Sequence, residues 1–295
     1  MRIFLTGATG YIGSAVLESL MRAGHHVTAL VRGAEATARL RARGVTPVVG
    51  DLAEPATYRG AASLCEGAIH AASESSARGP ELDRLAIETL LTHAKAFFIY
   101  TSGVWVLGNS KEATEESAVN PAEHVCWRPP HEQMVLDGAT NGLRTLVVRP
   151  GIVYGGSRGI VADLLKDAAN GLVRVIGPGD NHWALVYDRD LGELYSRLAS
   201  EPDASGIFHA TDHGDETVGE IVEAVVAAST TRPAVRHVPI EEARKKLKSY
   251  ADALNLDQIV RSHRARALGW APSLHSVSGN VRRLIEEFRR GKEAA

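Results

Sequence analysis

The chain has 295 residues, with 33 lysines and arginines against 35 aspartates and glutamates, so its formal net charge is −2. This near-neutral charge, without a long block of like charges, argues against a dedicated nucleic-acid binder. A hydrophobic content of 44% against 23% charged residues excludes a disordered chain. The length predicts one large α/β domain, or one domain with an appendage.

The two cysteines, Cys65 and Cys126, indicate a reducing compartment. They are too few for a disulfide scaffold and form no CxxC pair, and no cluster of ligand residues predicts a metal site. The sequence shows neither a signal-peptide pattern nor an apolar run of about 18 residues, so we expect a cytoplasmic protein that does not enter the membrane.

Strand and helix patterns alternate from the first residues onward. Residues 3–6 form a short apolar strand, residues 11–23 carry apolar side chains at helical spacing up to Gly24, and residues 26–31 are strand-like again. The alternation continues with helices at 34–43, 82–93 and 130–138 and strands at 46–49, 68–72, 96–101 and 144–148. Strands that alternate with helices predict a doubly wound α/β fold, in which helices cover both faces of a parallel sheet.

The composition and the secondary-structure pattern of the chain change after residue 150. Residues 151–184 are glycine-rich with one clear helix at 160–170, a helix follows at 188–200, and short strands and helices are mixed over 207–290. We expect residues 1–150 to form the first domain, with 185–205 packed back on it. Residues 151–184 and 206–295 are expected to form a smaller, mixed lobe that carries substrate specificity.

The glycine loop TGATGYIG, residues 6–13, lies between the first strand and the first helix. Glycines at this place allow a tight turn, a close backbone approach to a pyrophosphate and close packing of helix on strand. The N-terminus of the following helix offers unpaired N–H groups to the phosphates. We therefore predict a dinucleotide site formed by Gly7, Thr9, Gly10, Tyr11, Ile12 and Gly13.

The residue that ends the second strand indicates which dinucleotide is bound. An acidic residue about 20 positions beyond the loop would accept hydrogen bonds from a ribose 2′-hydroxyl, whereas an arginine accommodates a 2′-phosphate. Here the strand ends in Arg32, which favours NADP over NAD. The alternative is that Arg32 faces solvent and Glu35 contacts the ribose.

Five segments together resemble a known family: TGATGYIG at 6–13, GDL at 50–52, AIHAAS at 68–73, YTSG at 100–103 and RPGIVYG at 149–155. In this order they are similar to the extended short-chain dehydrogenases/reductases, often labelled the NAD-dependent epimerase/dehydratase family. The resemblance implies a Rossmann-type fold. It also implies that Asp51 and Leu52 contact the adenine, that Ala71 and Ala72 pass beneath the dinucleotide, and that Pro150 to Val153 flank the nicotinamide.

The resemblance also implies catalytic roles, with one departure. Ser102 resembles the serine that hydrogen-bonds the reacting substrate oxygen, with Thr101 as an alternative. Counting back from Glu132 puts Arg128 in the place of the family's lysine and His124 in the place of its tyrosine. Either His124 replaces tyrosine as the acid/base, or the pair is vestigial and the acid is His182, Tyr187, water or absent. Because prolines 129 and 130 favour a helix start, His124 and Arg128 are not guaranteed to share one helix.

The sequence predicts an NADP(H)-dependent oxidoreductase that moves a hydride between the nicotinamide and a small carbonyl or alcohol substrate. The alternatives are an epimerase or dehydratase that stores the hydride transiently, and a non-catalytic NADP-binding regulator. We expect no nucleic-acid, membrane or metal partner, and a monomer or homodimer. His70 is interpreted as a buried structural histidine and Cys126 as a packed thiol. The residues expected to line the substrate pocket are Trp105, His182, Trp183 and Tyr187, with Arg158 as a further possibility.

Overall fold

The computed structural model describes residues 1–140 and 142–293, which divide into two compact units. The first unit contains Met1–Ser102, Trp127–Arg149 and Leu191–Phe208, and the second contains Gly103–Cys126, Pro150–Asp190 and the chain from His209 onward. The segment that returns to the first unit, 191–208, overlaps the expected 185–205, but residues 185–190 belong to the second unit and residues 206–208 to the first. Residues 103–126, which we expected in the first domain, belong to the second unit.

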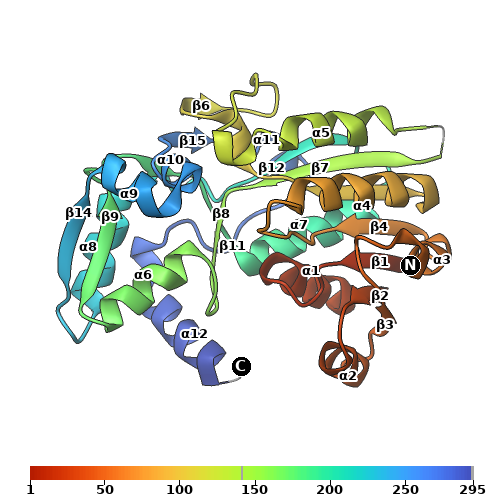
Figure 1. Ribbon diagram of the computed structural model, residues 1–295, viewed down its shortest axis with the longest axis horizontal. Helices are drawn as coiled ribbons and strands as arrows, with labels where there is room; N and C mark the ends of the chain where they lie inside the picture. The colour runs from red at the N-terminus through yellow and green to blue at the C-terminus, as the bar shows by residue number, and fades with distance from the viewer. Residues whose placement is uncertain (141, 294–295) are drawn as a thin grey trace. The chain divides into compact units, whose positions relative to one another are not determined.

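A seven-stranded sheet forms the centre of the first unit (Figure 1), in the order β12-β7-β5-β4-β1-β2-β3. Its strands are β1 (Arg2–Thr6), β2 (His26–Val31), β3 (Thr46–Val49), β4 (Gly67–His70), β5 (Phe97–Thr101), β7 (Arg144–Pro150) and β12 (Gly206–Ala210). Strand β1 pairs in parallel with β2 on one side and with β4 on the other, and β2–β3, β4–β5 and β5–β7 are also parallel. The predicted doubly wound α/β sheet is confirmed.

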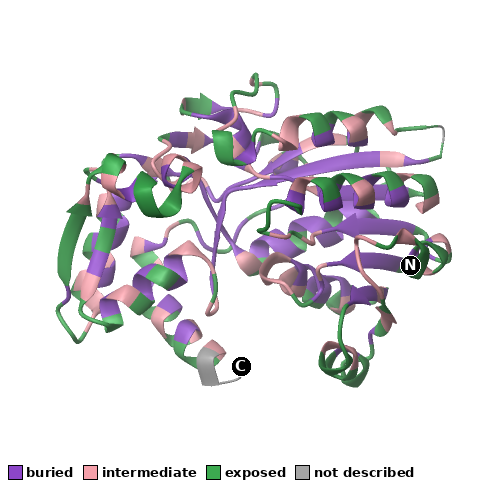
Figure 2. Ribbon diagram, in the orientation of Figure 1, coloured by how far each residue is buried: buried purple, intermediate pink, exposed green. Residues whose placement is uncertain are grey.

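Helices cover both faces of this sheet. Successive side chains of a strand point to opposite faces, so an apolar strand places side chains on both faces that must be buried. On β1, Phe4 packs into a core cluster with residues of α3, α4 and α5, while Ile3 and Leu5 are equally buried on the opposite face. Figure 2 shows the inner strands of the sheet as buried and the helices as exposed along their outer sides, whereas the edge strand β3 is only partly buried. The helices are α1 (Tyr11–Arg22), α2 (Ala34–Ala42), α3 (Arg59–Ser63), α4 (Gly79–His93), α5 (Arg128–Asp137) and α7 (Asp188–Ser200), with the short turn η1 (Pro55–Thr57).

The second unit is mixed, as expected, and is built from four two-stranded sheets among the described residues. The pairs are β6 (Ser110–Ala113) with β15 (Gln258–Val260), β8 (Ile152–Tyr154) with β11 (Leu185–Tyr187), β9 (Leu172–Ile176) with β14 (Ala234–Val238), and β10 (His182–Trp183) with β13 (Glu216–Thr217). The helices are α6 (Ile160–Ala169), α8 (Val218–Ala228), α9 (Ile240–Leu247), α10 (Ser249–Leu254), α11 (His263–Ala267) and α12 (Val281–Glu293), and the short turns are η2 (Val104–Leu107), η3 (Glu123–Val125) and η4 (Ser278–Asn280).

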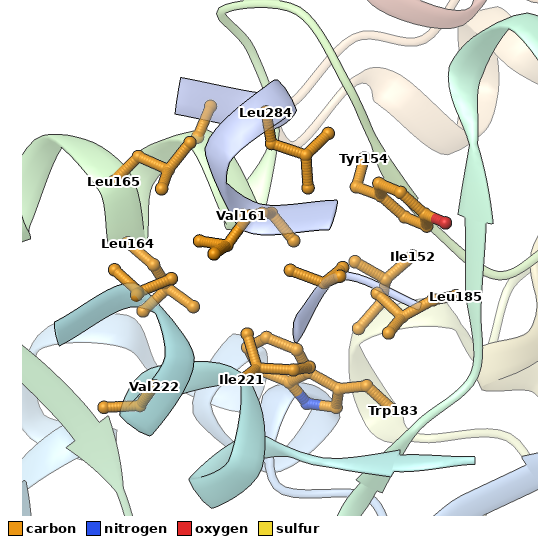
Figure 3. Close-up of a cluster of buried hydrophobic side chains, with 14 of the residues drawn as sticks. Ile152, Tyr154, Val161, Leu164, Leu165, Trp183, Leu185, Ile221, Val222 and Leu284 are labelled. Atoms are coloured by element: carbon orange, nitrogen blue, oxygen red, sulfur yellow. The ribbon is translucent and has the colours of Figure 1, made fainter. Parts of the chain in front are cut away.

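The core of the second unit lies between α6, α8, α12 and the strands β8 and β11 (Figure 3). Val161, Leu165, Ile221 and Leu284 belong there to one buried apolar cluster that also contains Trp183 and Tyr154. Helix α8 begins with a capping box, in which the Thr217 side chain accepts from the backbone N–H of Glu220. Within the described part of the chain, no helix is long and apolar enough to cross a membrane.

Candidate functional site

The glycine loop folds back on itself between β1 and α1. Gly7 has a φ of 77°, in the left-handed region that favours glycine, and a Cβ built there would lie 2.5 Å from the carbonyl oxygen of Ala71. A Cβ at Gly13 would lie 2.0 Å from the carbonyl oxygen of Gly7. The loop therefore lies against the backbone of residues 71 and 72, which were predicted to pass beneath the dinucleotide.

Helix α1 begins at this loop with an open N-terminus. Its N-cap is Gly10, which has no side chain to satisfy the first amide groups, and its first turn contains no acidic residue. Tyr11 and Ile12 in that turn are half-buried, and Thr9 in the loop is exposed. The N-terminal N–H groups of a helix point along its axis, and together with the positive end of the helix dipole they suit an anion such as a pyrophosphate.

The remaining predicted cofactor contacts follow the strands next to β1. Because β1 to β5 are parallel, the residues after each strand lie along the same edge of the sheet. Asp51 and Leu52 are half-buried after β3, and the Asp51 carboxylate accepts a hydrogen bond of 2.9 Å from the backbone of Ala53. The backbone N–H of Ala72 donates to Thr6 Oγ1 at 3.3 Å. Residues 71 and 72 after β4 therefore lie against the glycine loop, whereas Asp51 and Leu52 lie farther along the same edge of the sheet.

Arg32 follows the last residue of β2 and extends into solvent. Its side chain is 76% exposed, and Nη1 lies 3.8 Å from a carboxylate oxygen of Glu74. Glu35, the alternative ribose contact, lies in the first turn of α2, where its carboxylate is 3.9 Å from Arg39. An exposed ion pair of this kind is weak, so the guanidinium of Arg32 can exchange its carboxylate partner for a phosphate.

Ser102 and Thr101 were alternative candidates for the hydroxyl that contacts substrate, and their surroundings differ. Thr101 Oγ1 shares a hydrogen bond of 2.7 Å with the hydroxyl of Tyr195 on α7. The Ser102 hydroxyl is buried and has no hydrogen-bond partner among the described residues, although the Ser102 backbone donates to Val148 at 2.8 Å. A buried hydroxyl without a partner is uncommon, so the geometry favours Ser102.

Arg128 is the first residue of α5 and is fixed at the end of β5. Its Nη1 donates to the carbonyl oxygen of Thr101 at 3.0 Å and to the hydroxyl of Tyr100 at 3.2 Å. Its guanidinium also lies over the ring of Trp127, 4.4 Å from the ring centre. A positive charge is therefore held beside Ser102, in the place that the resemblance gives to a lysine.

His124 belongs to the second unit and does not share a helix with Arg128. It lies on the turn η3, while α5 begins only at Arg128, as the two prolines in its first turn require. The imidazole is exposed, and its ring centre lies 5.1 Å from that of Tyr250 and 6.2 Å from that of Trp105. The spacing of four residues therefore does not aim His124 and Arg128 at one point from a single helix.

The side chains predicted to line a substrate pocket divide into two groups. Trp183 and Tyr187 are only 7% and 1% exposed and belong to the core of the second unit. The indole of Trp183 donates to the Leu254 carbonyl at 2.9 Å, and the Tyr187 hydroxyl donates to Glu287 at 2.7 Å. We therefore interpret both as packing residues. Pro150 and Val153, predicted beside the nicotinamide, are likewise buried, at the end of β7 and in β8.

His182, by contrast, is half-exposed and forms a pair with Asp257. Its Nδ1 lies 2.8 Å from a carboxylate oxygen of Asp257, which also accepts from the His182 backbone at 2.8 Å. Burial raises the pKa of the Asp257 carboxyl, but these two hydrogen bonds outweigh burial and lower that pKa below its ordinary value. A carboxylate that fixes one imidazole nitrogen leaves the other nitrogen to exchange protons.

Sequence reasoning missed a group of buried polar side chains behind Arg128. Asp83 of α4 accepts a hydrogen bond from the Tyr100 hydroxyl, and both histidines nearby, His70 and His131, face its carboxylate. His70 was correctly interpreted as buried, but its contact with Asp83 was not foreseen. These side chains come from four different elements, so no local pattern could have indicated that they meet. The interpretation of Cys126 as a packed thiol was wrong, because Cys126 is exposed.

These observations define a Rossmann-type α/β protein with a glycine-lined cradle at the carboxyl edge of a parallel sheet. The chain belongs to the NAD dependent epimerase/dehydratase family, whose profile matches residues 3–211. The family expected from the sequence is therefore confirmed.

The chain is similar over nearly its whole length to an uncharacterized protein of Schizosaccharomyces pombe, with 33% identity over 94% of this chain and 96% of that one. It is 32% identical to a 4-hydroxy-2-methyl-3-oxo-4-farnesyl-3,4-dihydroquinoline-1-oxide ketoreductase of Stigmatella aurantiaca, over 52% of this chain and 51% of that one. A human epimerase family protein solved with NADPH has the same fold, with a TM-score of 0.78 and 18% identity over 97% of this chain and 99% of that chain.

Proposed function

We propose that the protein is an NADP(H)-dependent oxidoreductase that reduces a small carbonyl compound, or oxidises the corresponding alcohol. The observation that carries the proposal is the buried Ser102 hydroxyl, which has no partner among the described residues and follows Thr101, whose carbonyl oxygen accepts from the fixed guanidinium of Arg128. The name of the ketoreductase relative supports carbonyl chemistry. The NADPH in the human structure supports the cofactor class.

The residues of the cradle fit a dinucleotide, because side chains at Gly7 and Gly13 would fill the space that the loop leaves against its neighbours. Gly7 to Gly13 and the N-terminus of α1 would hold the pyrophosphate, Arg32 the 2′-phosphate, and Arg128 the nicotinamide ribose. The bound cofactor supplies the hydride that converts a carbonyl carbon into an alcohol carbon.

The protein's own groups act on the substrate oxygen. Ser102 donates a hydrogen bond to that oxygen and stabilises the negative charge that grows on it as the hydride arrives at the carbon. The oxygen then takes one proton, so that hydride and proton together give the alcohol. His124 is our candidate donor, with the His182–Asp257 pair or water as alternatives.

A non-catalytic NADP-binding regulator is the second candidate, because histidine stands where the family's acid/base tyrosine is expected. The two functions are separated by following NADPH oxidation at 340 nm with a panel of aldehydes, ketones and quinones. Turnover of any of them establishes an oxidoreductase, whereas NADPH binding without turnover across the panel favours the regulator. A substrate converted to an isomer or dehydrated without net NADPH use would instead indicate an epimerase or dehydratase.

The first prediction concerns the choice of cofactor. Replacing Arg32 by alanine is expected to weaken NADPH binding about tenfold or more and to leave NADH binding within about twofold, because the guanidinium contacts only the 2′-phosphate. Titration of protein fluorescence with each dinucleotide measures this difference. Arg22→Ala removes another exposed arginine, which pairs with Glu193, and should change neither affinity. Equal effects of Arg32→Ala on both dinucleotides would contradict the proposed role.

The second prediction concerns the hydroxyl group at the end of β5. Ser102→Ala is expected to lower kcat on the order of 100-fold with little change in NADPH affinity, because the lost donor acts mainly on the charge formed during the reaction. Thr101→Val removes a hydroxyl that bonds Tyr195 instead and should lower kcat much less. The reverse order of the two effects would assign the substrate contact to Thr101.

A further inference from the structure

The buried polar groups behind Arg128 form one connected array inside the first unit. The Asp83 carboxylate receives the Tyr100 hydroxyl at 2.8 Å and the Nδ1 of His131 at 2.8 Å. The Nε2 of His70 lies 3.3 Å from the other carboxylate oxygen. All four side chains are buried. An ionised carboxylate is tolerated in a protein core only when it is paired and hydrogen-bonded in this way.

The ionised state of Asp83 fixes the direction of the hydrogen bonds. Burial raises the pKa of the Asp83 carboxyl, but the hydrogen bond from His131, the close approach of His70 and the charge of Arg128 outweigh burial and hold that pKa well below its ordinary range. An ionised carboxylate can only accept. The hydroxyl hydrogen of Tyr100 is therefore committed to Asp83, and its oxygen is left to accept from Arg128.

Arg128 is consequently held through one edge of its guanidinium. The hydrogen bonds that it makes within the described chain all use Nη1, toward Tyr100 and Thr101. Its Nε and Nη2 donate to no described protein group, and the residue is half-buried. Nε and Nη2 of the guanidinium thus remain available as donors, while the hydrogen bonds of Nη1 to Tyr100 and Thr101 fix its orientation.

The array also reaches the glycine loop. Nδ1 of His70 lies 2.6 Å from the hydroxyl of Thr6, the residue immediately before Gly7. That hydroxyl in turn accepts from the backbone of Ala72 at 3.3 Å. The same buried carboxylate is therefore linked to both places where the proposed function puts contacts with the cofactor.

We propose that Tyr100 and Asp83 are positioning residues, which orient the Arg128 guanidinium toward the nicotinamide ribose before the dinucleotide binds. This inference rests on the proposed function. Neither residue touches the cofactor, and both act through Arg128. The hydroxyl of Tyr100 and the carboxylate of Asp83 thereby stabilise one orientation of the Arg128 side chain. Without them, an arginine at a helix start would sample several rotamers.

The test compares two ligands. Tyr100→Phe removes only the hydroxyl and is expected to raise the Kd for NADPH about fivefold. The Kd for adenosine 2′,5′-bisphosphate, which has no nicotinamide ribose, should stay within about twofold. Asp83→Asn, which keeps the shape of the carboxylate, should act in the same direction. In an Arg128→Met background, Tyr100→Phe should have no further effect on the Kd for NADPH.

Tyr58→Phe is the matched control. Tyr58 is a fully buried tyrosine of the same core cluster, and its hydroxyl has no partner among the described residues. It should change neither Kd. Equal weakening of both ligands by Tyr100→Phe, or an undiminished effect in the Arg128→Met background, would overturn the inference and leave the proposed function intact. Absence of NADPH and NADH binding by the unmodified protein would overturn both.

Discussion

Gly13→Ala is expected to abolish most dinucleotide binding, raising the Kd for NADPH at least about 100-fold. The added Cβ would lie 2.0 Å from the carbonyl oxygen of Gly7 and 2.5 Å from its carbonyl carbon. Both are backbone atoms, so no side chain can rotate away and the loop itself must move. Because a cofactor held by backbone N–H groups needs the loop in place, even a small displacement removes several contacts at once. Fluorescence titration with NADPH measures the loss.

Gly60→Ala provides the control for this substitution. Gly60 lies exposed in α3, and a Cβ built there meets nothing within 4 Å. The control should bind NADPH normally and gain roughly 0.5 kcal/mol of stability, since alanine restricts the unfolded chain. If Gly13→Ala remains folded by circular dichroism and binds NADPH as tightly as the unmodified protein, the loop is not the pyrophosphate site.

Local signals made the first unit predictable. The glycine loop, Gly24 and the apolar spacing of residues 11–23 are features of single segments, and α1 was placed within one residue of its observed end at Arg22. The features that could not be predicted depend on contacts between residues far apart in the sequence. Residues 103–126 join the second unit because β6 pairs with β15 and because the Gln258 side chain donates to the carbonyls of residues 104 and 108. Partners some 150 residues apart leave no pattern in one sequence.

The candidate site shows the same division. Arg128 could be found by counting along the chain, but its fixed orientation depends on Tyr100 and Asp83, which lie on other elements. His124 could also be found by counting along the chain. It lies on the short turn η3, however, and α5 begins only at Arg128, so the two residues are not four positions apart on one helix. The sequence therefore indicated which residue types to expect, and tertiary packing determined which of them meet.

A buried ion pair joins α5, the helix that Arg128 begins, to β7. Glu132 of α5 and Arg149 of β7 are both buried, with side chains 3% exposed, and their contact is bidentate. The Nη1 of Arg149 has no hydrogen-bond partner among the described residues. The carboxylate of Glu132 is thus the group that compensates this buried positive charge. The pair also fixes α5 against β7, and Arg128 begins that helix.

Glu132→Gln is expected to destabilise the protein by about 3 to 5 kcal/mol, because it leaves the Arg149 guanidinium buried without a counter-charge. Replacing both residues, as in Glu132→Met with Arg149→Met, should recover most of this loss, since two apolar side chains need no pairing. Urea denaturation followed by circular dichroism measures the free energy of unfolding of each variant.

The matched control for this pair is Glu88→Gln, which breaks an exposed ion pair with Arg84 on α4. It should change the free energy of unfolding by less than about 0.5 kcal/mol, because water replaces the lost partner of Arg84. If Glu132→Gln lowers the free energy of unfolding as little as this control does, another group compensates the charge of Arg149, and the packing of α5 does not depend on the ion pair. A double substitution as harmful as Glu132→Gln alone would instead mean that the shape of the pair, rather than its charge, stabilises the packing of α5 on β7.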